Sequence, residues 1–426
     1  MKKVIVYGAG ISGQGAAEVL TKQGAEVKIY TDDMGDFAQL LPGTDLLVLS
    51  PGVSPEKPEV QMALQQGVTV LPEIEVAYNN YKGHLAGITG TNGKTTTTTL
   101  VGEMFKTLGV PTKVAGNIGL SMTKELDGLP ENAWVAAELS SFQLETTKDF
   151  APHIACCLNL TPDHLERHHT LEVYYEAKRR ICVNQTSSDF AVLNYDDVNM
   201  RCWSMNLKSQ ICYFSRKIEL PEGVFVRDEK FVIRWHDKEY VVCPVADMQI
   251  FGPHNVENAL AALAVGFLAG CQVEDMARVI KEFQPVEHRL EYVRTLDGVK
   301  YYNDSKATNT DSAVKALESF PNGHVVLIAG GHDKMTDLGD FMTAVKKYVD
   351  ELILLGEAKA RFNEAAEQAG IKNIHLVETF ADGVAKAHEL AKAPQVVLLS
   401  PACSSYDMFN NYPERGRKFK ELVKAL

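Results

Sequence analysis

Gly87-Ile-Thr-Gly-Thr-Asn-Gly-Lys-Thr95 is the stretch that decides the fold class, because it has the composition of a phosphate-binding loop. Residues 84–89 before it predict a short apolar strand, and residues 95–109 after it show the apolar spacing of a helix. A glycine-rich turn between a strand and a helix directs backbone N–H groups and the positive helix end at a polyphosphate. We therefore expect Lys94 to bind the terminal phosphates of a nucleotide and the Thr95 hydroxyl to bind Mg²⁺.

The loop departs at one position from the strict pattern G-x-x-x-x-G-K-[ST], because Ile88 occupies the place of the first glycine. The alternative is a plain Gly/Thr turn without a ligand. That alternative does not explain a lysine followed by a threonine at the start of a helix, so we predict nucleotide binding.

Length and composition indicate an ordinary soluble protein of two or three domains, since 45% of the 426 residues are hydrophobic and 23% are charged. The formal net charge of −12 argues against nucleic acid as the main partner, because nucleic-acid-binding proteins usually carry a basic face. The N-terminus lacks the apolar run of a signal peptide, and no segment has the roughly 18 uninterrupted apolar residues of a membrane span. Eight cysteines without a C-x-x-C pair indicate buried thiols, so we expect a cytoplasmic enzyme.

Residues 1–82 carry the fingerprint of a dinucleotide-binding fold. Gly8-Ala-Gly10-Ile-Ser-Gly13 follows a predicted strand at 3–7 and precedes a predicted helix, and a second strand is predicted at 26–30. An NAD site would need an acidic residue at the end of that second strand, where Thr31 stands instead. The pattern therefore predicts the fold and leaves an NAD site in doubt.

The rest of the chain alternates strands and helices, which predicts mostly parallel sheets in two further domains, 83–284 and 285–426. In the first of these the predicted elements are strands at 135–139, 154–158 and 191–193, a strand-rich stretch at 210–250 and an alanine-rich helix at 256–268. In the second they are strands at 299–302, 325–328, 351–355 and 396–399.

Polar residues follow several of these strands, at the ends where ligands collect in parallel sheets. Glu138 lies at the end of strand 135–139 and is predicted to bind Mg²⁺ or to organise water, with a surface glutamate as the alternative. Asp163 and His164 follow the next strand and are expected to reach the same nucleotide. Lys178 lies in a predicted helix, and the residues around it do not single it out.

Two polar loops follow strands of the last domain. They are Asn303-Asp-Ser-Lys-Ala-Thr-Asn309 and Ser400-Pro-Ala-Cys-Ser-Ser-Tyr-Asp407. Many short hydrogen-bonding side chains at a strand end favour a binding loop over core, and we expect both loops to line one cleft. Cys403 has no evident base partner in the sequence, so we interpret it as a packing thiol.

Taken together, these motifs resemble the Mur ligase family, the ATP-dependent amide-forming enzymes of peptidoglycan synthesis. The resemblance extends over essentially the whole chain. The matching segments are 90–95, 116–119, 138–145, 159–168, 175–178, 252–258, 288–289, 303–309 and 400–407.

The resemblance implies three α/β domains. They are a dinucleotide-binding-like domain at 1–82 for the UDP-substrate, a phosphate-loop ATPase-type domain at 83–284, and a Rossmann-like domain at 285–426 for the amino acid. Within the family the chain is similar to the members that add D-glutamate. Asn92 stands where alanine-adding members typically have histidine, and the Asp-Asn-Pro-Arg signature of the diamino-acid-adding members is absent.

The implied reaction has two steps. ATP phosphorylates the alanyl carboxylate of UDP-N-acetylmuramoyl-L-alanine, and the amine of D-glutamate then attacks the acyl phosphate, with ADP and phosphate as the other products. The resemblance also implies two Mg²⁺ ions. We expect a monomer with no nucleic-acid partner.

By the same resemblance, one Mg²⁺ is held by Thr95 and Glu138, and the other by His164 and a carbamoylated Lys178. The residues implied in catalysis are Lys94, Glu138, His164, Lys178, Asp304 and Lys306. The residues implied in ATP binding are Gly90, Thr91, Asn92, Gly93, Lys94, Thr95, Thr96, His254, Asn255, Asn258, Arg289 and Asp304.

The substrates are assigned to further residues by the same resemblance. The UDP-substrate is assigned to Ile11, Ser12, Gly52, Asn117 and His164. D-Glutamate is assigned to Thr308, Lys334, Ser405, Tyr406 and Tyr412, where a lysine and hydroxyl groups suit a dianionic amino acid.

Three alternatives stay open at this point. The first is another ligase of the same superfamily, either a Mur-type ligase with a different amino-acid specificity or folylpolyglutamate synthetase, which lacks a dinucleotide-like first domain. An NAD-dependent oxidoreductase would explain residues 8–13 and leave the phosphate loop unexplained. A phosphate-loop switch or scaffold without catalysis would not need the two polar loops of the last domain.

Overall fold

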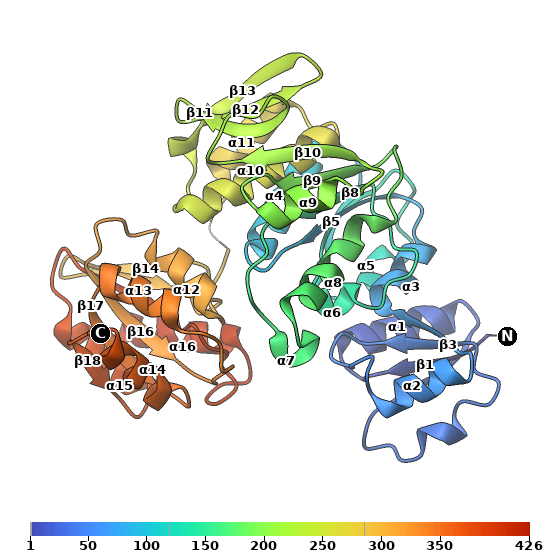
Figure 1. Ribbon diagram of the computed structural model, residues 1–426, viewed down its shortest axis with the longest axis horizontal. Coiled ribbons are helices and arrows are strands. Elements are labelled where there is room, and N and C mark those ends of the chain that lie inside the picture. The colour runs from blue at the N-terminus through green and yellow to red at the C-terminus, as the bar shows by residue number, and fades with distance from the viewer. Residues whose placement is uncertain (1, 119, 285) are drawn as a thin grey trace. The chain divides into compact units, whose positions relative to one another are not determined.

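Sheets of mostly parallel strands, with helices between the strands, make up the computed structural model (Figure 1). The structure describes residues 2–118, 120–284 and 286–426, so Gly119 and Pro285 of the predicted motifs lie outside the described residues. The chain divides into two compact units, Met1–Met248 with Glu257–Phe283 and Gln249–Val256 with Gln284–Leu426. The α/β class predicted from the sequence is therefore confirmed. The boundaries at 82 and 284 stay predictions.

The first unit begins with a parallel sheet in the strand order β2-β1-β3-β4. Its elements are β1 (Lys3–Tyr7), α1 (Ile11–Lys22), β2 (Glu26–Tyr30), η1 (Phe37–Gln39), β3 (Leu46–Leu49), α2 (Pro58–Gln65), β4 (Thr69–Pro72) and α3 (Glu73–Asn80). The strands predicted at 3–7 and 26–30 are confirmed by β1 and β2. A Cβ on Gly13 would overlap the Gly8 carbonyl, so the glycine fingerprint serves the close approach of α1 to β1.

Alternate residues of β1 face opposite sides of this sheet, as strand geometry requires. Ile5 and Tyr7 pack in the core that contains residues of α2, whereas Val4 and Val6 pack in the core that contains residues of α1. A strand that is apolar on both faces is typical of a parallel sheet covered by helices on both sides.

Helix α3 joins the first sheet to the second. Its Ile74 and Ala77 side chains lie in the core of the second sheet together with Leu85 and Val135. The buried carboxylate of Glu73 accepts hydrogen bonds from the backbone N–H of Thr123, at 2.6 Å, and from its hydroxyl. The first two sheets are therefore fastened together within the first unit.

The second sheet has the strand order β13-β12-β11-β10-β9-β8-β5-β7-β6, in which the seven strands β5 to β11 run parallel and β12 and β13 form an antiparallel extension. Its strands are β5 (His84–Thr89), β6 (Thr112–Gly116), β7 (Trp134–Glu138), β8 (Ile154–Cys157), β9 (Phe190–Asn194), β10 (Gln210–Ser215), β11 (Gly223–Arg227), β12 (Lys230–Trp235) and β13 (Lys238–Pro244). The associated helices are α4 (Lys94–Lys106), α5 (Met122–Leu126), α6 (Ser141–Leu144), α7 (Leu165–His168), α8 (Leu171–Val183), α9 (Val198–Ser204), η2 (Val245–Asp247), α10 (Pro253–Leu268) and α11 (Val273–Glu282).

The helix after the phosphate loop is shorter than predicted. It was expected over 95–109, and α4 ends at Lys106. Gly109 has a φ of 70°, in the left-handed region that ends helices, and Pro111 follows two residues later. The predicted helix at 256–268 begins three residues early in α10, at Pro253, because proline is favoured in the first turn.

The second unit contains a sheet in the order β14-β15-β19-β16-β17-β18, in which β14 alone among the described strands is antiparallel. Its elements are β14 (Glu291–Leu296), β15 (Val299–Asn303), α12 (Thr310–Leu317), β16 (Val325–Gly330), α13 (Gly339–Tyr348), β17 (Val349–Leu355), α14 (Lys359–Gln368), β18 (Ile374–Leu376), α15 (Phe380–Leu390), β19 (Val396–Leu399) and α16 (Tyr412–Ala425). Separate cores cover the two faces of this sheet, one with α12, α13 and α14 and one with α15 and α16 (Figure 1).

None of the described helices combines the length and the apolar character that a membrane crossing requires.

Candidate active site

The phosphate loop connects β5 to α4 at the carboxyl end of the second sheet. Strands β8, β5, β7 and β6 are neighbours, so the loops that follow them meet at one edge. Gly93 has a φ of 85°, and a Cβ there would overlap the side-chain oxygen of Asn258 on α10. The sequence therefore needs glycine at this position, because Asn258, one of the residues assigned to ATP, lies directly against the loop.

The loop after β8 holds the phosphate loop in place. The Asn92 backbone N–H donates to Asn159 Oδ1 at 2.8 Å, and Asn159 Nδ2 donates back to the Asn92 carbonyl at 3.0 Å. The Thr91 hydroxyl donates to the Thr161 carbonyl at 3.0 Å. These bonds give the loop a defined shape before any ligand binds.

Lys94 and Lys178 converge on one carbonyl oxygen of the phosphate loop. Lys94 Nζ donates to the Gly90 carbonyl at 2.9 Å and to the Thr91 carbonyl at 2.8 Å, and Lys178 Nζ donates to Gly90 at 2.8 Å. Lys178 is 2% exposed. Burial, and then the charge of Lys94, lower the pKa of Lys178 well below its usual range, which favours the neutral amine.

Glu138 lies at the end of β7 with 2% of its surface exposed. Its Oε1 accepts a hydrogen bond from Asn117 Nδ2 at 3.1 Å, and Asn117 follows the neighbouring strand β6. Among the described residues, none donates a hydrogen bond to Glu138 Oε2. A buried carboxylate oxygen without a protein donor fits a divalent cation, which takes oxygen ligands.

His164 begins the short helix α7 in the left-handed region, with a φ of 54°. Its Nδ1 lies 3.3 Å from Glu166 Oε1, and its Nε2 lies 3.6 Å from Asp163 Oδ2. The carboxylates of Asp163 and Glu138 have a smaller effect in the opposite direction: they raise the pKa of Lys178. Glu138 and Asp163 therefore lie near Lys178, which contacts the phosphate loop at Gly90, and His164 lies beside Asp163; their roles stay predictions.

The turn after β3 lies beside the glycine fingerprint of the first sheet. The Ser50 hydroxyl donates to the Gly8 carbonyl at 3.3 Å. Ile11 and Gly52, which are assigned to the UDP-substrate, are exposed, and Ser12 is half-buried. An exposed surface at the carboxyl end of a parallel sheet is where this fold binds its ligands.

Asp32, the acidic residue that follows Thr31, interacts with two other side chains. Tyr7 donates a hydrogen bond to the Asp32 carboxylate, and Lys57 Nζ lies 2.5 Å from Asp32 Oδ2. The lysine first, and then the tyrosine, lower the pKa of Asp32. Sequence reasoning missed Lys57, because it lies 25 residues beyond Asp32 with no motif around it.

In the second unit, Asp304 follows β15 and is fully buried. Its two oxygens accept hydrogen bonds from the Leu290 backbone N–H, at 3.2 Å, and from the Ser400 hydroxyl, at 2.9 Å, and Arg289 Nη1 lies 3.8 Å away. Burial raises the pKa of Asp304 to about 6, and Arg289 opposes that rise. The two polar loops predicted to share a cleft therefore touch each other, through Ser400 and Asp304.

The residues assigned to D-glutamate lie on loops after three neighbouring strands, β15, β19 and β16. Ser405 is buried, Thr308 and Lys334 are half-buried, and Tyr406 is 72% exposed. The hydroxyl of Tyr412, at the start of α16, accepts a hydrogen bond from Lys306 Nζ at 3.1 Å.

Three of the residues assigned to ATP lie at the start of α10, where the chain passes from one compact unit to the other. His254 and Asn255 belong to the second unit, and Asn258 belongs to the first. Burial, and then the charges of Arg289 and Lys315, lower the pKa of His254 to about 3, so this imidazole is neutral near pH 7.

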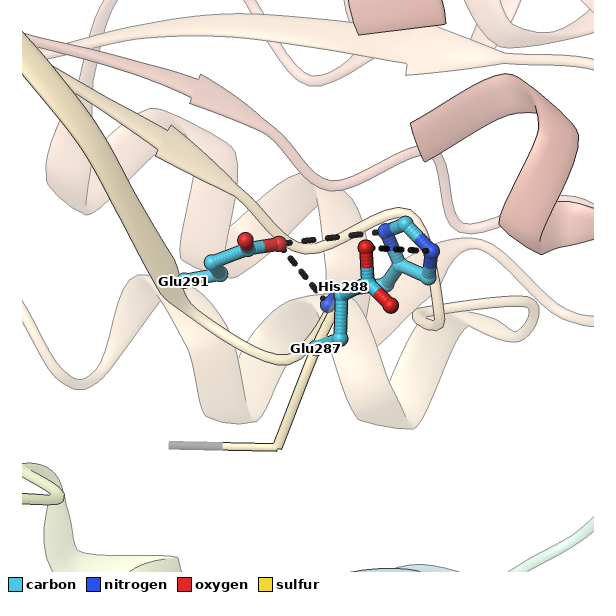
Figure 2. Close-up of side chains that lie close together, drawn as sticks. All are labelled: Glu287, His288 and Glu291. Atoms are coloured by element: carbon cyan, nitrogen blue, oxygen red, sulfur yellow. Dashed lines mark hydrogen bonds and ion pairs between the residues drawn. The ribbon is translucent and has the colours of Figure 1, made fainter. Parts of the chain in front are cut away.

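A cluster of Glu287, His288 and Glu291 has the residue types of a metal site (Figure 2). Lys420 Nζ lies 2.6 Å from Glu287 Oε1 and 2.8 Å from Glu291 Oε1. Asn303 Nδ2 lies 2.9 Å from His288 Nδ1 and donates to Glu291 Oε2 at 3.0 Å. The lysine already supplies the cation for both carboxylates, so we interpret the cluster as an ion-pair network beneath the Asp304 loop.

Sequence reasoning also missed Arg415, on α16. This arginine is buried and donates to Ser305 Oγ at 3.0 Å and to the Cys403 carbonyl at 3.0 Å. It connects the same two loops that Ser400 and Asp304 connect. Its signal in the sequence is weak, because an arginine in a polar C-terminal helix is usually solvated.

A phosphate loop at the carboxyl end of a parallel sheet, with a buried carboxylate and a buried lysine beside it, is typical of phosphate-loop nucleotide-binding proteins.

Comparison with known proteins shows to which family of phosphate-loop proteins the chain belongs. Residues 88–266 match the Mur ligase middle domain, and residues 288–403 match the Mur ligase, glutamate ligase domain. The UDP-N-acetylmuramoylalanine--D-glutamate ligase of Lachnoclostridium phytofermentans is 42% identical over 447 residues, covering 100% of this chain and 98% of that protein. The protein of the same name from Alkaliphilus metalliredigens is 42% identical over 450 residues, with the same coverage. The chain belongs to the Mur ligase family.

A solved structure supports the fold. The MurF ligase of Thermotoga maritima in complex with ADP has a TM-score of 0.62 at 17% identity, over 92% of each chain. The resemblance inferred from the motifs is confirmed, and the relatives favour it over the three alternatives.

Proposed function

We propose that this chain is an ATP-dependent ligase that joins D-glutamate to UDP-N-acetylmuramoyl-L-alanine in peptidoglycan precursor synthesis. The names of its full-length relatives support the substrates. The structural observation that carries the proposal is the group of Lys94, Lys178 and Glu138 around the phosphate loop, where a buried carboxylate oxygen has no donor among the described residues. Such a group suits the transfer of a phosphoryl group.

The chemistry explains why a nucleotide is needed. A free carboxylate is a poor acylating agent, because its leaving group would be oxide. An oxygen of the alanyl carboxylate attacks the γ-phosphorus of ATP, and ADP leaves. The amine nitrogen of D-glutamate then attacks the carbonyl carbon of the acyl phosphate, phosphate leaves, and the nitrogen loses a proton.

In this reaction Lys94 would leave its loop carbonyls and bind the phosphate oxygens, where its charge favours the transition state. Thr95 and Glu138 would hold one Mg²⁺, and His164 and Lys178 a second; the ions neutralise charge on the transferred group. The residues of the phosphate loop, Gly90 to Thr96, would donate backbone N–H groups to the nucleotide.

Lys178 would serve as a carbamate. Its neutral amine nitrogen attacks the carbon of CO₂ and loses a proton, which converts a nitrogen donor into an oxygen ligand. The burial of Lys178 and its lowered pKa support this step, because only the unprotonated amine reacts. Activity should fall when dissolved CO₂ is removed and return when bicarbonate is added. Full activity in CO₂-free buffer would contradict the carbamate and leave the ligase proposal standing.

The remaining assignments are also proposals. Arg289, Asp304, His254, Asn255 and Asn258 would contribute to ATP binding. D-Glutamate would bind to Thr308, Lys334, Ser405, Tyr406 and Tyr412, with Lys306 beside them. Ile11, Ser12, Gly52 and Asn117 would contact the UDP-substrate. We further propose that the enzyme works in the cytoplasm as a monomer.

The decisive experiment measures phosphate release from Mg-ATP in the presence of UDP-N-acetylmuramoyl-L-alanine, with the amino acid varied. We expect release that requires D-glutamate and fails with L-glutamate, L-alanine and diamino acids. Release with another amino acid would keep the family and overturn the substrate. If no amino acid supports release, the proposed activity is wrong.

A further inference from the structure

The guanidinium of Arg415 lies in the interior of the second unit, 1% exposed. Its Nε donates to the Ser305 hydroxyl at 3.0 Å, and its two terminal nitrogens donate to the carbonyls of Ser305 at 2.9 Å, Cys403 at 3.0 Å and Ser404 at 3.1 Å. All of these acceptors are neutral. Among the described residues, no carboxylate forms an ion pair with Arg415.

Arg415 bonds to two loops directly, and a third loop joins the same network. Ser305 lies on the loop after β15, and Cys403 and Ser404 lie on the loop after β19. The Ser404 carbonyl also accepts the backbone N–H of His332, on the loop after β16, at 3.0 Å. The Ser305 hydroxyl donates to the carbonyl of Tyr412, the first residue of α16, at 2.8 Å. Arg415 therefore bonds directly to the loops after β15 and β19, and the Ser404 carbonyl extends this network to the loop after β16, so the network includes every segment that carries an assigned D-glutamate residue.

The chemistry of arginine explains why this residue suits the position. Its planar group presents five donors in a fixed fork, whereas lysine presents a single nitrogen on a flexible stem. A buried cation is expensive to desolvate, and even a buried ion pair can often be replaced by well-packed apolar side chains without loss of stability. Stability alone therefore does not explain a buried arginine whose hydrogen bonds all go to neutral groups. Its charge forms no ion pair among the described residues and interacts only at longer range with Asp304 and Asp407, so it favours an anionic ligand on the loops that it holds.

We propose that Arg415 is a positioning residue for the amino-acid substrate, which fixes the three loops in the arrangement that binds the carboxylates of D-glutamate. This inference rests on the proposed ligase function. It assigns Arg415 no contact with the substrate, so its effect passes through Ser305, Cys403 and Ser404.

The test is Arg415→Lys, which keeps the charge and loses most of the hydrogen bonds. We expect the KM for D-glutamate to rise about tenfold or more, while the Kd for ATP, measured by direct titration, changes less than about twofold. The matched control is Arg417→Lys on the same helix, because Arg417 is exposed. We expect this variant to behave as the wild type in both measurements.

Ser305→Ala provides a second route if Arg415→Lys does not fold, because it keeps Arg415 and removes only the Ser305 hydroxyl, with its bonds to Arg415 Nε and to the Tyr412 carbonyl. It should raise the KM for D-glutamate less than Arg415→Lys does. The double variant should raise this KM by less than the product of the two single fold-changes. An unchanged KM in both single variants overturns the proposal. So does an equal loss of ATP and D-glutamate binding that follows the loss of thermal stability. If the wild type itself shows no D-glutamate-dependent release, the proposed function has failed rather than the role of Arg415.

Discussion

The loops at the carboxyl end of the nine-stranded sheet and those at the carboxyl end of the six-stranded sheet both contain buried charged side chains. The two groups differ in the partners of those charges. In the first group, Glu138 Oε2 is buried without a donor among the described residues, and Lys94 and Lys178 share one carbonyl. In the second, both oxygens of the buried Asp304 accept hydrogen bonds, and the donors of Arg415 meet neutral acceptors.

The difference indicates two ways of preparing a site. The first group of loops has charged atoms whose best partners come from outside the chain, as metal ions, phosphate and CO₂ would. The second group is organised by its own buried arginine and carboxylate, so its geometry exists before the ligand arrives. Substitutions in the first group of loops should therefore lower the reaction rate. Substitutions in the second group should misplace the amino-acid substrate or change the stability of the fold.

The largest effect is expected for Lys94→Ala. It removes the cation predicted to bind the transferred phosphoryl group, and we expect the rate of D-glutamate-dependent phosphate release to fall about a thousandfold. Lys106→Ala is the matched control, because Lys106 ends the same helix with its side chain 62% exposed. A Lys94→Ala enzyme with more than about a tenth of the wild-type rate would refute the role of the loop.

The next effect is expected for Glu138→Gln, which keeps the shape of the side chain and removes its charge. Activity should fall about a hundredfold, and half-maximal activity should need more Mg²⁺, because a neutral amide is a weaker ligand for a divalent cation. The measurement is a Mg²⁺ titration of initial rates. Glu103→Gln on α4, where the side chain is 43% exposed, is the control. A reduced rate with an unchanged Mg²⁺ requirement would argue against a metal ligand.

In the second group, Asp304 should make stability depend on pH. Its pKa is about 6 in the folded chain against 3.8 as the ordinary value, so the folded state binds the proton more tightly. This group therefore destabilises the fold progressively as the pH rises from about 4 to about 6 and fully above that range. Two pKa units correspond to about 3 kcal/mol at most.

Asp304→Asn cannot ionise, so its unfolding free energy should decline less than that of the wild type between pH 4 and pH 6. Urea unfolding across that range checks this expectation. Asp297→Asn, at an exposed turn, should retain the wild-type slope. Parallel curves for Asp304→Asn and the wild type would show that Asp304 does not titrate as its burial implies.

The smallest effect is expected for Cys403→Ala. Burial raises the pKa of the Cys403 thiol to about 12, so the thiol stays protonated near neutral pH and is no nucleophile. Activity should stay within about twofold of the wild type, since Arg415 contacts the Cys403 backbone rather than its sulfur. Iodoacetamide should modify the exposed Cys202 before Cys403, as mass spectrometry would detect. Inactivation that tracks modification of Cys403 would contradict this interpretation.

Much of the fold could be read from the sequence, because short apolar runs between glycine-rich or polar turns are local signals. The strands predicted at 84–89 and 396–399 agree with β5 and β19 to the residue. Helix ends were less accurate, as at α4 and α10, because capping and proline preferences shift a boundary by a turn. The phosphate loop and Glu138 were predicted as site residues for the same local reason: each lies at the end of a predicted strand.

The sequence by itself determined the α/β class, the phosphate loop, the polar loops after the strands and, through the motifs, the family. Only the tertiary structure decided that Lys178 is buried with a lowered pKa, that Lys57 pairs with Asp32, and that Arg415 bonds to the loops after β15 and β19. Arg415 and Ser305 are 110 residues apart in the chain. Burial and long-range hydrogen bonds depend on which elements pack against each other, and a local pattern of residues does not predict that packing.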